Sequence, residues 1–306
     1  MLKIAAVIVT HNRLDKLKKA INSLLKQSYA ISQVFVVDNQ SSDGTMDYLS
    51  NLSLENEHVT VITSKKNLGG AGGFHLGLEA VQKLNFDWVS IADDDAVYDL
   101  DYMRNMVMTI DKSPDIKCFT GTVIEDGSIG LEHRIQIDDL SRLKLSKMTI
   151  NNYKENFRVD IATFVGVFLS CPLLKKIGLP RADFFIWYDD IEYSLRISKE
   201  TKIINVIDAK IYHLTDNNSA GQNGVNRPLT WKDYYGYRNR WVTMNIYCPD
   251  QTILKKQLKY EYFRYQIGAL LKHNDTLSKV ASLKLVKTAH NDFKRGIMGQ
   301  NQNYLP

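Results

Sequence analysis

The most informative stretch of the sequence is Trp88-Val89-Ser90-Ile91-Ala92-Asp93-Asp94-Asp95, an apolar, strand-like run that ends in three carboxylates. Carboxylates just past the carboxyl end of a parallel strand lie where open α/β sheets bind ligands, and hard oxygen ligands suit Mg²⁺ or Mn²⁺. Aspartate is also common in turns and at helix N-caps, so an isolated triplet is more often structural. The residues that follow the preceding strands distinguish between the two interpretations, a metal-bound diphosphate site and an ordinary turn.

The first half of the chain alternates apolar strands with amphipathic helices. Buried strands are predicted at 3–10, 34–37, 59–63 and 88–92, and helices at 14–25, 45–52 and 73–84. Strands that alternate with helices at this spacing predict an α/β fold with a doubly wound, mostly parallel sheet and a Rossmann-like nucleotide-binding half.

Polar residues gather at the carboxyl end of each predicted strand. They are Thr10, His11, Asn12 and Arg13, then Asp38 and Asn39, then Asn67, then the three aspartates. Each cluster alone fits ordinary loop chemistry. Because all four fall on the same edge of the sheet, where a ligand crevice is expected, we interpret them together as one ligand site.

A glycine-rich run, Asn67-Leu68-Gly69-Gly70-Ala71-Gly72-Gly73-Phe74, needs a separate decision. A dinucleotide-binding fingerprint would follow the first strand, whereas these glycines follow the third and His75 replaces the last glycine. The dehydrogenase interpretation therefore fails. Glycine also lets backbone approach a phosphate or sugar closely, and a flexible loop that leads into a helix is the structural alternative.

Composition fits an ordinary globular protein, since 306 residues with 44% hydrophobic and 24% charged side chains can bury a large core. No apolar run approaches the roughly eighteen residues of a membrane span, and the first strand runs into polar residues rather than a signal-cleavage site. We therefore expect a cytoplasmic protein. Cys118, Cys171 and Cys248 are scattered, which predicts reduced, mostly structural thiols.

The second half carries a different acidic pattern. Residues 125–154 lose regular alternation and are predicted to form an insertion or mobile loop, while Pro172 is placed to open a short helix that ends near Gly178. Two carboxylates, Asp189 and Asp190, then start a helix. They could serve only as a helix cap with Glu192 in a capping box, or one could act as a base on an acceptor hydroxyl.

Aromatic and imidazole side chains flank this acidic pair along the sequence. Trp187 and Tyr188 directly precede it and are natural sugar platforms, although aromatic core packing is commoner. His213 ends an apolar run at 203–212. An isolated histidine is usually structural, but an imidazole beside the aspartates could complete a metal coordination sphere.

The ordered motifs resemble those of family 2 glycosyltransferases with the GT-A fold. In the first half they are Thr10-His11-Asn12-Arg13, Val37-Asp38-Asn39 with Ser42, Asn67-Leu68-Gly69-Gly70 and Asp93-Asp94-Asp95. In the second half they are Trp187 with Asp189-Asp190-x-Glu192-Tyr193-x-Leu195-Arg196, Tyr212-His213, and the run from Trp231 to Arg240. The second set resembles the galactofuranosyltransferase branch, with bacterial rhamnosyltransferases as neighbours, and the similarity covers roughly Lys3 to Arg240.

This resemblance implies a role for particular residues. It implies that Asp190, with Asp189 beside it, supplies the general base, and that Asp93, Asp95 and His213 hold Mn²⁺ or Mg²⁺. The implied donor contacts are Thr10, Asn12, Arg13, Asp38, Asn67, Gly69, Gly70 and Asp94, and the implied acceptor contacts are Trp187, Tyr188 and Glu192. Two departures concern the acceptor: Tyr188 separates Trp187 from the acidic pair, and the expected Trp-rich segment is represented by 164–168.

The resulting expectation is an inverting, metal-dependent hexosyltransferase that uses UDP-galactofuranose as first choice and a bacterial, lipid-linked surface glycan as acceptor. A rhamnosyltransferase, a nucleotidyltransferase and a non-catalytic carbohydrate-binding scaffold are the alternatives. We expect a nucleotide-sugar-binding half at 1–124, an acceptor-binding half at 125–245 and a basic helical extension at 246–306. No nucleic-acid partner is expected. The extension's lysines suit either a solvated face or an anionic membrane on the inner face of the cell, and a homo-oligomer is left open.

Overall fold

The computed structural model describes residues 1–214, 228–271 and 276–305. The chain forms two compact units that interleave in sequence. The first unit consists of 1–136, 146–182 and 190–215, and the second consists of 137–145, 183–189 and 216–306. Compactness does not show which substrate each part binds, so the functional division at residues 124 and 245 stays a prediction.

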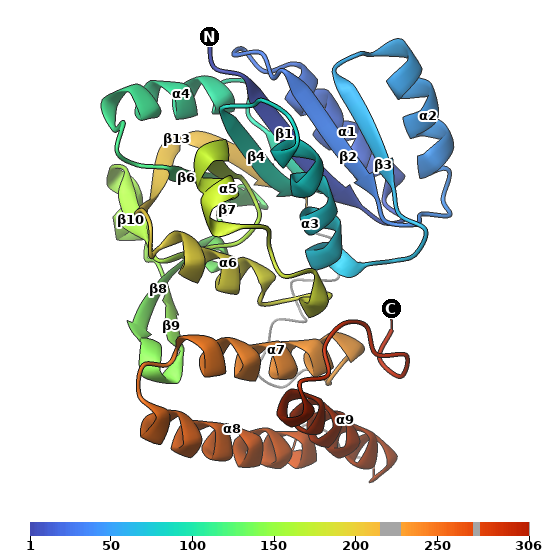
Figure 1. The fold of residues 1–306 in the computed structure, drawn as a ribbon, viewed down its shortest axis with the longest axis vertical. Helices are drawn as coiled ribbons and strands as arrows, with labels where there is room; N and C mark the ends of the chain where they lie inside the picture. Colours follow the sequence, from blue (N-terminus) through green and yellow to red (C-terminus); the bar gives the residue numbers. More distant parts are fainter. Residues whose placement is uncertain (215–227, 272–275, 306) are drawn as a thin grey trace. The chain divides into compact units, whose positions relative to one another are not determined.

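The first unit is built on a parallel core of four strands. These are β1 (Ile4–Thr10), β2 (Gln33–Asp38), β3 (Val59–Thr63) and β4 (Trp88–Asp93), in the spatial order β4-β1-β2-β3. The helices between them are α1 (Leu14–Leu25), α2 (Thr45–Glu55) and α3 (Gly69–Gln82) (Figure 1). The predicted alternation is confirmed. The register pairs Val9 with both Val37 and Asp93, so the polar residues that follow these strands emerge at one edge.

The sheet is covered on both faces because successive residues of β1 point to opposite sides. Ile4, Ala6 and Ile8 join one core cluster with residues of α1 and α4 (Tyr102–Lys112). Ala5, Val7 and Val9 join the other, with residues of α3 and α5 (Cys171–Ile177). Every residue of β1 is buried, which explains why its sequence is continuously apolar rather than alternating.

Helix α3 begins at Gly69 rather than near Gly73, so the alternative of a flexible glycine loop is wrong for residues 70–73. The reason is packing. A Cβ atom on Gly73 would lie 2.3 Å from Val9 Cγ1, and one on Gly77 would lie 2.4 Å from Val7 Cγ1. Glycine therefore lets α3 lie directly against β1. At Gly70, by contrast, an added Cβ would meet nothing within 4 Å, so backbone there is open to a ligand.

Beyond β4 the sheet becomes mixed. Strand β12 (Val167–Ser170) runs antiparallel to both β4 and β6 (Cys118–Glu125), and β13 (Ile203–His213) runs parallel to β6, with β10 (Phe157–Val159) outside it. The short strand β5 (Ala96–Tyr98) pairs with the end of β13, so that His213 lies opposite Ala96. This pairing brings a histidine from far along the chain next to the acidic triplet.

The expectation of an irregular or mobile insertion at 125–154 is wrong. This stretch contains β7 (Ser128–Ile129), β8 (Arg134–Asp139) and β9 (Lys144–Lys147) with short 3-10 turns at Leu131–His133, Leu140–Arg142 and Ile150–Lys154. Strand β8 pairs with β11 (Ile161–Ala162) in a separate small sheet that also holds β9. Strands this short give too few alternations for a pattern to be recognised.

The second unit is mainly helical, as predicted for the tail. Its helices are α7 (Trp231–Tyr247), α8 (Gln251–Leu271) and α9 (Thr276–Arg295), and a capping box between Thr230 and Asp233 starts α7. Trp241 is fully buried and its ring meets Tyr265 of α8 and Phe293 of α9. Within the three described stretches, none of the helices combines the length and apolar composition that crossing a bilayer requires.

Candidate active site

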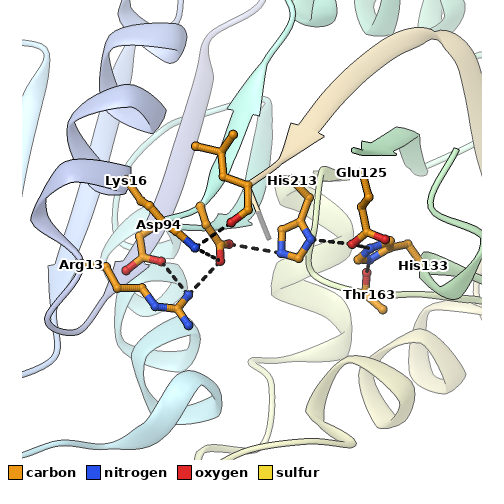
Figure 2. A network of polar contacts seen from close by, with 9 residues as sticks. Arg13, Lys16, Asp94, Glu125, His133, Thr163 and His213 are labelled. Carbon is orange, nitrogen blue, oxygen red and sulfur yellow. Dashed lines mark hydrogen bonds and ion pairs between the residues drawn. The ribbon is translucent and has the colours of Figure 1, made fainter. Parts of the chain in front are cut away.

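The acidic triplet at the end of β4 is held by side chains that follow β1. Thr10 Oγ1 donates to Asp94 Oδ2 at 2.7 Å, and Arg13 Nη1 donates to Asp95 Oδ2 at 2.8 Å and to Asp94 Oδ1 at 3.3 Å. Lys16 Nζ lies 3.8 Å from Asp95 Oδ2. Figure 2 shows these cations converging on the carboxylates. The structure therefore brings together the predicted site residues Thr10, Arg13, Asp94 and Asp95. Lys16 lies beside them, although no sequence motif predicted it.

The carboxyl groups of the triplet differ in pKa. Burial, together with the negative charges of Asp95 and Asp94, raises the pKa of Asp93 to about 7. Burial also acts on Asp95, but His213, Arg13 and Lys16 outweigh it and lower the pKa of that carboxyl. Carboxylates this close resist ionising together, and additional positive charge is the natural means of stabilising the fully ionised set.

His213 provides a third potential ligand from the end of β13. Its Nε2 forms an ion pair with Asp95 Oδ1 at 3.3 Å, and although burial opposes it, the interactions with Asp95 and Glu125 raise the pKa of the imidazole to about 9. Asp95 Oδ1 is buried, and no described residue hydrogen-bonds to it. A buried carboxylate oxygen without a donor, beside an imidazole nitrogen, fits a divalent cation. Asp93, Asp95 and His213 are the residues that would hold it.

Glu125 and His133 also belong to this site, and the motif analysis did not identify them. Glu125 Oε1 lies 2.7 Å from His213 Nδ1 and 2.9 Å from His133 Nε2. A signal was present, because Glu125 ends β6 beside β13, at the sheet edge that carries the other polar residues. The prediction of an insertion at residues 125–154 placed Glu125 outside the sheet, so its position at this edge was not recognised.

The loops after β1, β2 and β3 are tied to one another. Asn12 Oδ1 accepts from Ser42 N at 2.7 Å, and the buried Asp38 accepts from Ser41 N at 3.1 Å. Asn39 Nδ2 donates to Asn67 Oδ1 at 3.1 Å and to the Gly69 carbonyl at 3.0 Å. The structure thus connects the loops that carry Asn12, Asp38 and Asn67 with the first turn of α3, which carries Gly69 and Gly70. Asn39 and Gln40 join the second loop to the third, since Gln40 Oε1 accepts from Asn67 N at 3.0 Å.

The acidic pair lies at the start of helix α6 (Asp189–Ile197). Burial raises the pKa of Asp190 to about 6, which is a value suited to a general base near neutral pH. Glu192 is buried and pairs with Arg196 at 2.8 Å, as the helical spacing predicts. Arg196 also donates to the carbonyl oxygens of Ile177 and Leu179. Because the Glu192 carboxylate already pairs with Arg196, contact between Glu192 and an acceptor stays a prediction.

The segment directly before Asp189 is strained, and α7 holds it. Phe185, Trp187 and Tyr188 have φ values of 67°, 63° and 71°, a region that bulky residues rarely adopt. The buried Asn239 amide donates to the carbonyl oxygens of Phe184, Ile186 and Trp187 at 2.9, 3.0 and 2.9 Å.

Two further contacts within the same unit fix the aromatic side chains of this segment. The indole of Trp187 lies so close to Gly236 that a Cβ there would be 2.8 Å from Cε3, and the side chain remains 38% exposed. Arg240 donates to Tyr188 Oη at 3.4 Å and to Glu261 of α8 at 2.7 Å. The partly exposed indole therefore packs against α7 at Gly236, and its contact with an acceptor sugar stays a prediction.

Comparison with known proteins matches the profile described as glycosyl transferase family 2 to residues 5–178, which is more than half of the chain. The galactofuranosyltransferase GlfT1 of Mycobacterium tuberculosis is 27% identical over 270 residues, which cover 85% of this chain and 86% of that protein. The dTDP-rhamnosyl transferase RfbF of Shigella flexneri is 24% identical over 246 residues, 79% of each chain.

Solved structures resemble the chain at lower identity. GalNAc-T7 with UDP, GalNAc and Mn²⁺ has a TM-score of 0.66 and 14% identity, covering 97% of this chain and 56% of that one. The mannosyltransferase PcManGT of Pyrobaculum calidifontis with GDP-Man and Mn²⁺ has a TM-score of 0.57 and 14% identity, covering 96% of this chain and 79% of that one. At these identities the similarity establishes the GT-A fold.

Replacing Asn239 by alanine is expected to lower the free energy of unfolding by about 1–3 kcal/mol, because the carbonyl groups of Ile186 and Trp187 lose the amide donor and that of Phe184 keeps only its other donors. The same change should reduce transfer to an acceptor more than it reduces nucleotide binding, since the segment it holds carries Trp187 and Tyr188. Urea unfolding and separate binding and turnover assays measure the two effects. Asn105→Ala, which removes an exposed amide that donates to the Asp208 carbonyl, is the matched control. Equal stability of both variants would contradict the role of Asn239.

The stability of the metal-free protein is expected to fall as pH rises from about 6.5 to 9. The pKa of His213 is raised from 6.5 to about 9, so its contribution to stability is complete below pH 6.5 and is lost as pH passes through about 9. Thermal unfolding in a chelator measures this dependence. His213→Gln should flatten the curve, whereas His58→Gln, at an exposed position, should not. A pH dependence unchanged by His213→Gln would show that the imidazole is not held between two carboxylates.

Proposed function

This chain belongs to glycosyl transferase family 2, and on that basis we propose that it is an inverting, metal-dependent glycosyltransferase that moves a hexosyl group from a nucleoside diphosphate donor to a surface glycan. The observation that carries the proposal is the position of His213 Nε2, 3.3 Å from Asp95 Oδ1, a buried carboxylate oxygen that makes no hydrogen bond with the described residues. Family membership removes the nucleotidyltransferase alternative.

UDP-galactofuranose is the proposed donor, and a bacterial, lipid-linked glycan is the proposed acceptor. Support for the donor comes from the galactofuranosyltransferase that shares 27% identity over most of both chains. A rhamnosyl donor is the alternative, supported by the rhamnosyl transferase at 24%. The connected loops at Asn12, Asp38 and Asn67, with the open backbone of Gly70, are the proposed nucleotide contacts, while Thr10 would act by holding Asp94.

The proposed reaction is a single displacement. Asp190 accepts the proton of the acceptor hydroxyl as the hydroxyl oxygen attacks the anomeric carbon, which inverts that centre and releases the nucleoside diphosphate. A divalent cation at Asp93, Asp95 and His213 would supply positive charge to the departing diphosphate. Arg13 lies beside the same carboxylates and is proposed to contact the donor. No covalent enzyme intermediate is required. Trp187 and Tyr188 are proposed to stack against the acceptor sugar.

Helix α8 supports a peripheral membrane contact. Its exposed apolar side chains recur at a spacing that puts them on one face, and they are Tyr260, Phe263, Ile267, Leu270 and Leu271. Exposed cations accompany them at Lys255, Lys256, Lys259 and Arg264. An apolar face with basic neighbours suits the surface of an anionic bilayer, where each cation contributes about 1 kcal/mol. Such contact would bring the enzyme to a lipid-linked acceptor.

Donor binding and hydrolysis test the proposed function. UDP-galactofuranose should raise the melting temperature only with Mn²⁺ or Mg²⁺ present, and UDP should be released slowly without acceptor. Asp95→Asn should lose the metal-dependent part of this binding, because one ligand charge is removed, whereas Asp111→Asn, at an exposed position, should retain it. Binding of UDP-sugars that is indifferent to metal would contradict the metal site. Absence of any UDP release or transfer would favour the non-catalytic scaffold.

Asp190→Asn should retain donor and metal affinity while turnover falls by at least about 100-fold, the contribution typical of general-base catalysis. In the wild type, turnover should rise with pH through about 6, because the raised pKa of Asp190 keeps part of the base protonated below that value. Steady-state kinetics against pH, with isothermal titration of donor, measure both. If Asp189→Asn were inactive and Asp190→Asn active, the two roles would be reversed.

Binding to anionic liposomes tests the α8 surface. The protein should co-sediment at low salt and be released at high salt, because a Debye length of about 10 Å at 0.1 M screens surface charge. Reversing Lys255, Lys256 and Lys259 to Glu should abolish binding. The control reverses the same number of exposed charges elsewhere, at Lys19, Lys26 and Lys112. Equal loss in both triple variants would reduce the effect to net charge, and no loss in either would remove the membrane contact.

A further inference from the structure

A chain of hydrogen bonds extends away from the acidic triplet through His213. Figure 2 shows Glu125 between the two imidazoles, with its Oε1 2.7 Å from His213 Nδ1 and 2.9 Å from His133 Nε2. His133 Nδ1 in turn lies 2.8 Å from Thr163 Oγ1. These residues come from the end of β6, a 3-10 turn, the loop before β12 and the end of β13.

Donation along these hydrogen bonds converges on Glu125 from both sides. A glutamate side chain is ionised at neutral pH, so Glu125 Oε1, which lies within hydrogen-bond distance of both imidazoles, can only accept. The ring nitrogens that face it, His213 Nδ1 and His133 Nε2, must therefore carry hydrogens. When His213 is neutral, its lone pair is then on Nε2, which is the nitrogen that faces Asp95. His133 Nδ1 is left to accept from the hydroxyl of Thr163.

The outer part of the chain is rigidly held. His133 is 7% exposed, and its carbonyl accepts from Arg134 Nη1 at 2.7 Å. Arg134 is itself fully buried and also donates to the Gly121 and Val165 carbonyls. A fixed His133 leaves Glu125 Oε1 little freedom, and a fixed Glu125 orients the ring of His213. Burying these polar groups is costly unless they are paired, and the hydrogen bonds among His213, Glu125, His133 and Thr163 pair them.

We propose that Glu125, held by His133 and Thr163, is a positioning residue that keeps His213 in the Nδ1–H tautomer and presents Nε2 as a ligand beside Asp93 and Asp95. This inference rests on the proposed metal-dependent function. A histidine ligand must offer a bare nitrogen, and a carboxylate on its other nitrogen fixes that choice and increases its basicity. Glu125 acts through His213 and touches neither donor nor acceptor.

Mn²⁺ affinity of the full chain, measured with saturating UDP by the paramagnetic resonance signal of free Mn²⁺, tests the proposal. Glu125→Leu should weaken binding by about 10- to 100-fold, the usual effect of losing such a partner. Glu125→Gln should recover much of the loss, because its Oε1 can accept from both rings. Thr163→Val should have a smaller effect. Glu132→Leu is the matched control, since it removes an exposed carboxylate of the adjoining turn that pairs only at the surface with Lys147.

The outcomes separate this inference from the proposed function. If wild type failed to bind Mn²⁺ with UDP, the proposed function itself would fail. If wild type bound, His213→Ala did not, and Glu125→Leu bound within about twofold of wild type, the positioning role would be overturned. Equal losses in Glu125→Leu, Glu125→Gln and Glu132→Leu would reduce the effect to general electrostatics and also overturn it.

A different stoichiometry would also decide the matter. Glu125, His133 and His213 offer ligand atoms within 4.8 Å of one another, so they could hold an ion themselves. A second Mn²⁺ per chain that disappears in both His133→Ala and Glu125→Leu would make them a separate metal site and overturn the positioning role. The expected result is one Mn²⁺ ion per chain, with the largest loss of affinity in Glu125→Leu and smaller losses in Glu125→Gln and Thr163→Val. Should Glu125→Leu fail to fold, the other two variants still test the proposal. Mn²⁺ affinity that is lower in Glu125→Gln and Thr163→Val than in wild type supports it, and unchanged affinity in both contradicts it.

Discussion

Three consecutive carboxylates at the end of a buried strand must be compensated by positive charge, and much of the first unit is arranged around that requirement. Arg13 and Lys16 arrive from the first turns after β1, and His213 arrives from β13 through the pairing of its last residue with Ala96. These cations balance Asp94 and Asp95 but leave Asp93 with a pKa of about 7 and one oxygen of Asp95 without a donor among the described residues. The compensation is incomplete in the place where a divalent cation would complete it.

The parallel half of the fold could be predicted because each of its strands is buried and long enough to read. The continuous apolar run at β1 and the helical spacing of Leu17, Ile21 and Leu24 match the observed elements. The glycines of α3 were misread because sequence shows that a residue lacks a Cβ without showing why. Here Gly73 and Gly77 are needed for packing against β1, and only Gly70 is open.

The residues that escaped prediction depend on long-range register or on rare backbone geometry. Glu125 and His133 meet His213 only because β6 and β13 are neighbours, which no local pattern in the sequence reveals. Bulky residues such as Phe185, Trp187 and Tyr188 are not expected at positive φ, so the strained segment before the acidic pair could not be foreseen. Asn239 helps to hold that conformation, since its amide nitrogen lies within hydrogen-bond distance of three carbonyl oxygens of the segment.

Asp93, Asp95 and His213 are proposed to form one cation site that serves the diphosphate of a nucleotide sugar. Anomalous diffraction from a crystal grown with Mn²⁺ and UDP tests it most directly. We expect a single manganese peak between the carboxylates and His213 Nε2, in contact with the diphosphate. A peak between Glu125, His133 and His213 Nδ1, or a bound diphosphate with no metal beside Asp95, would contradict it.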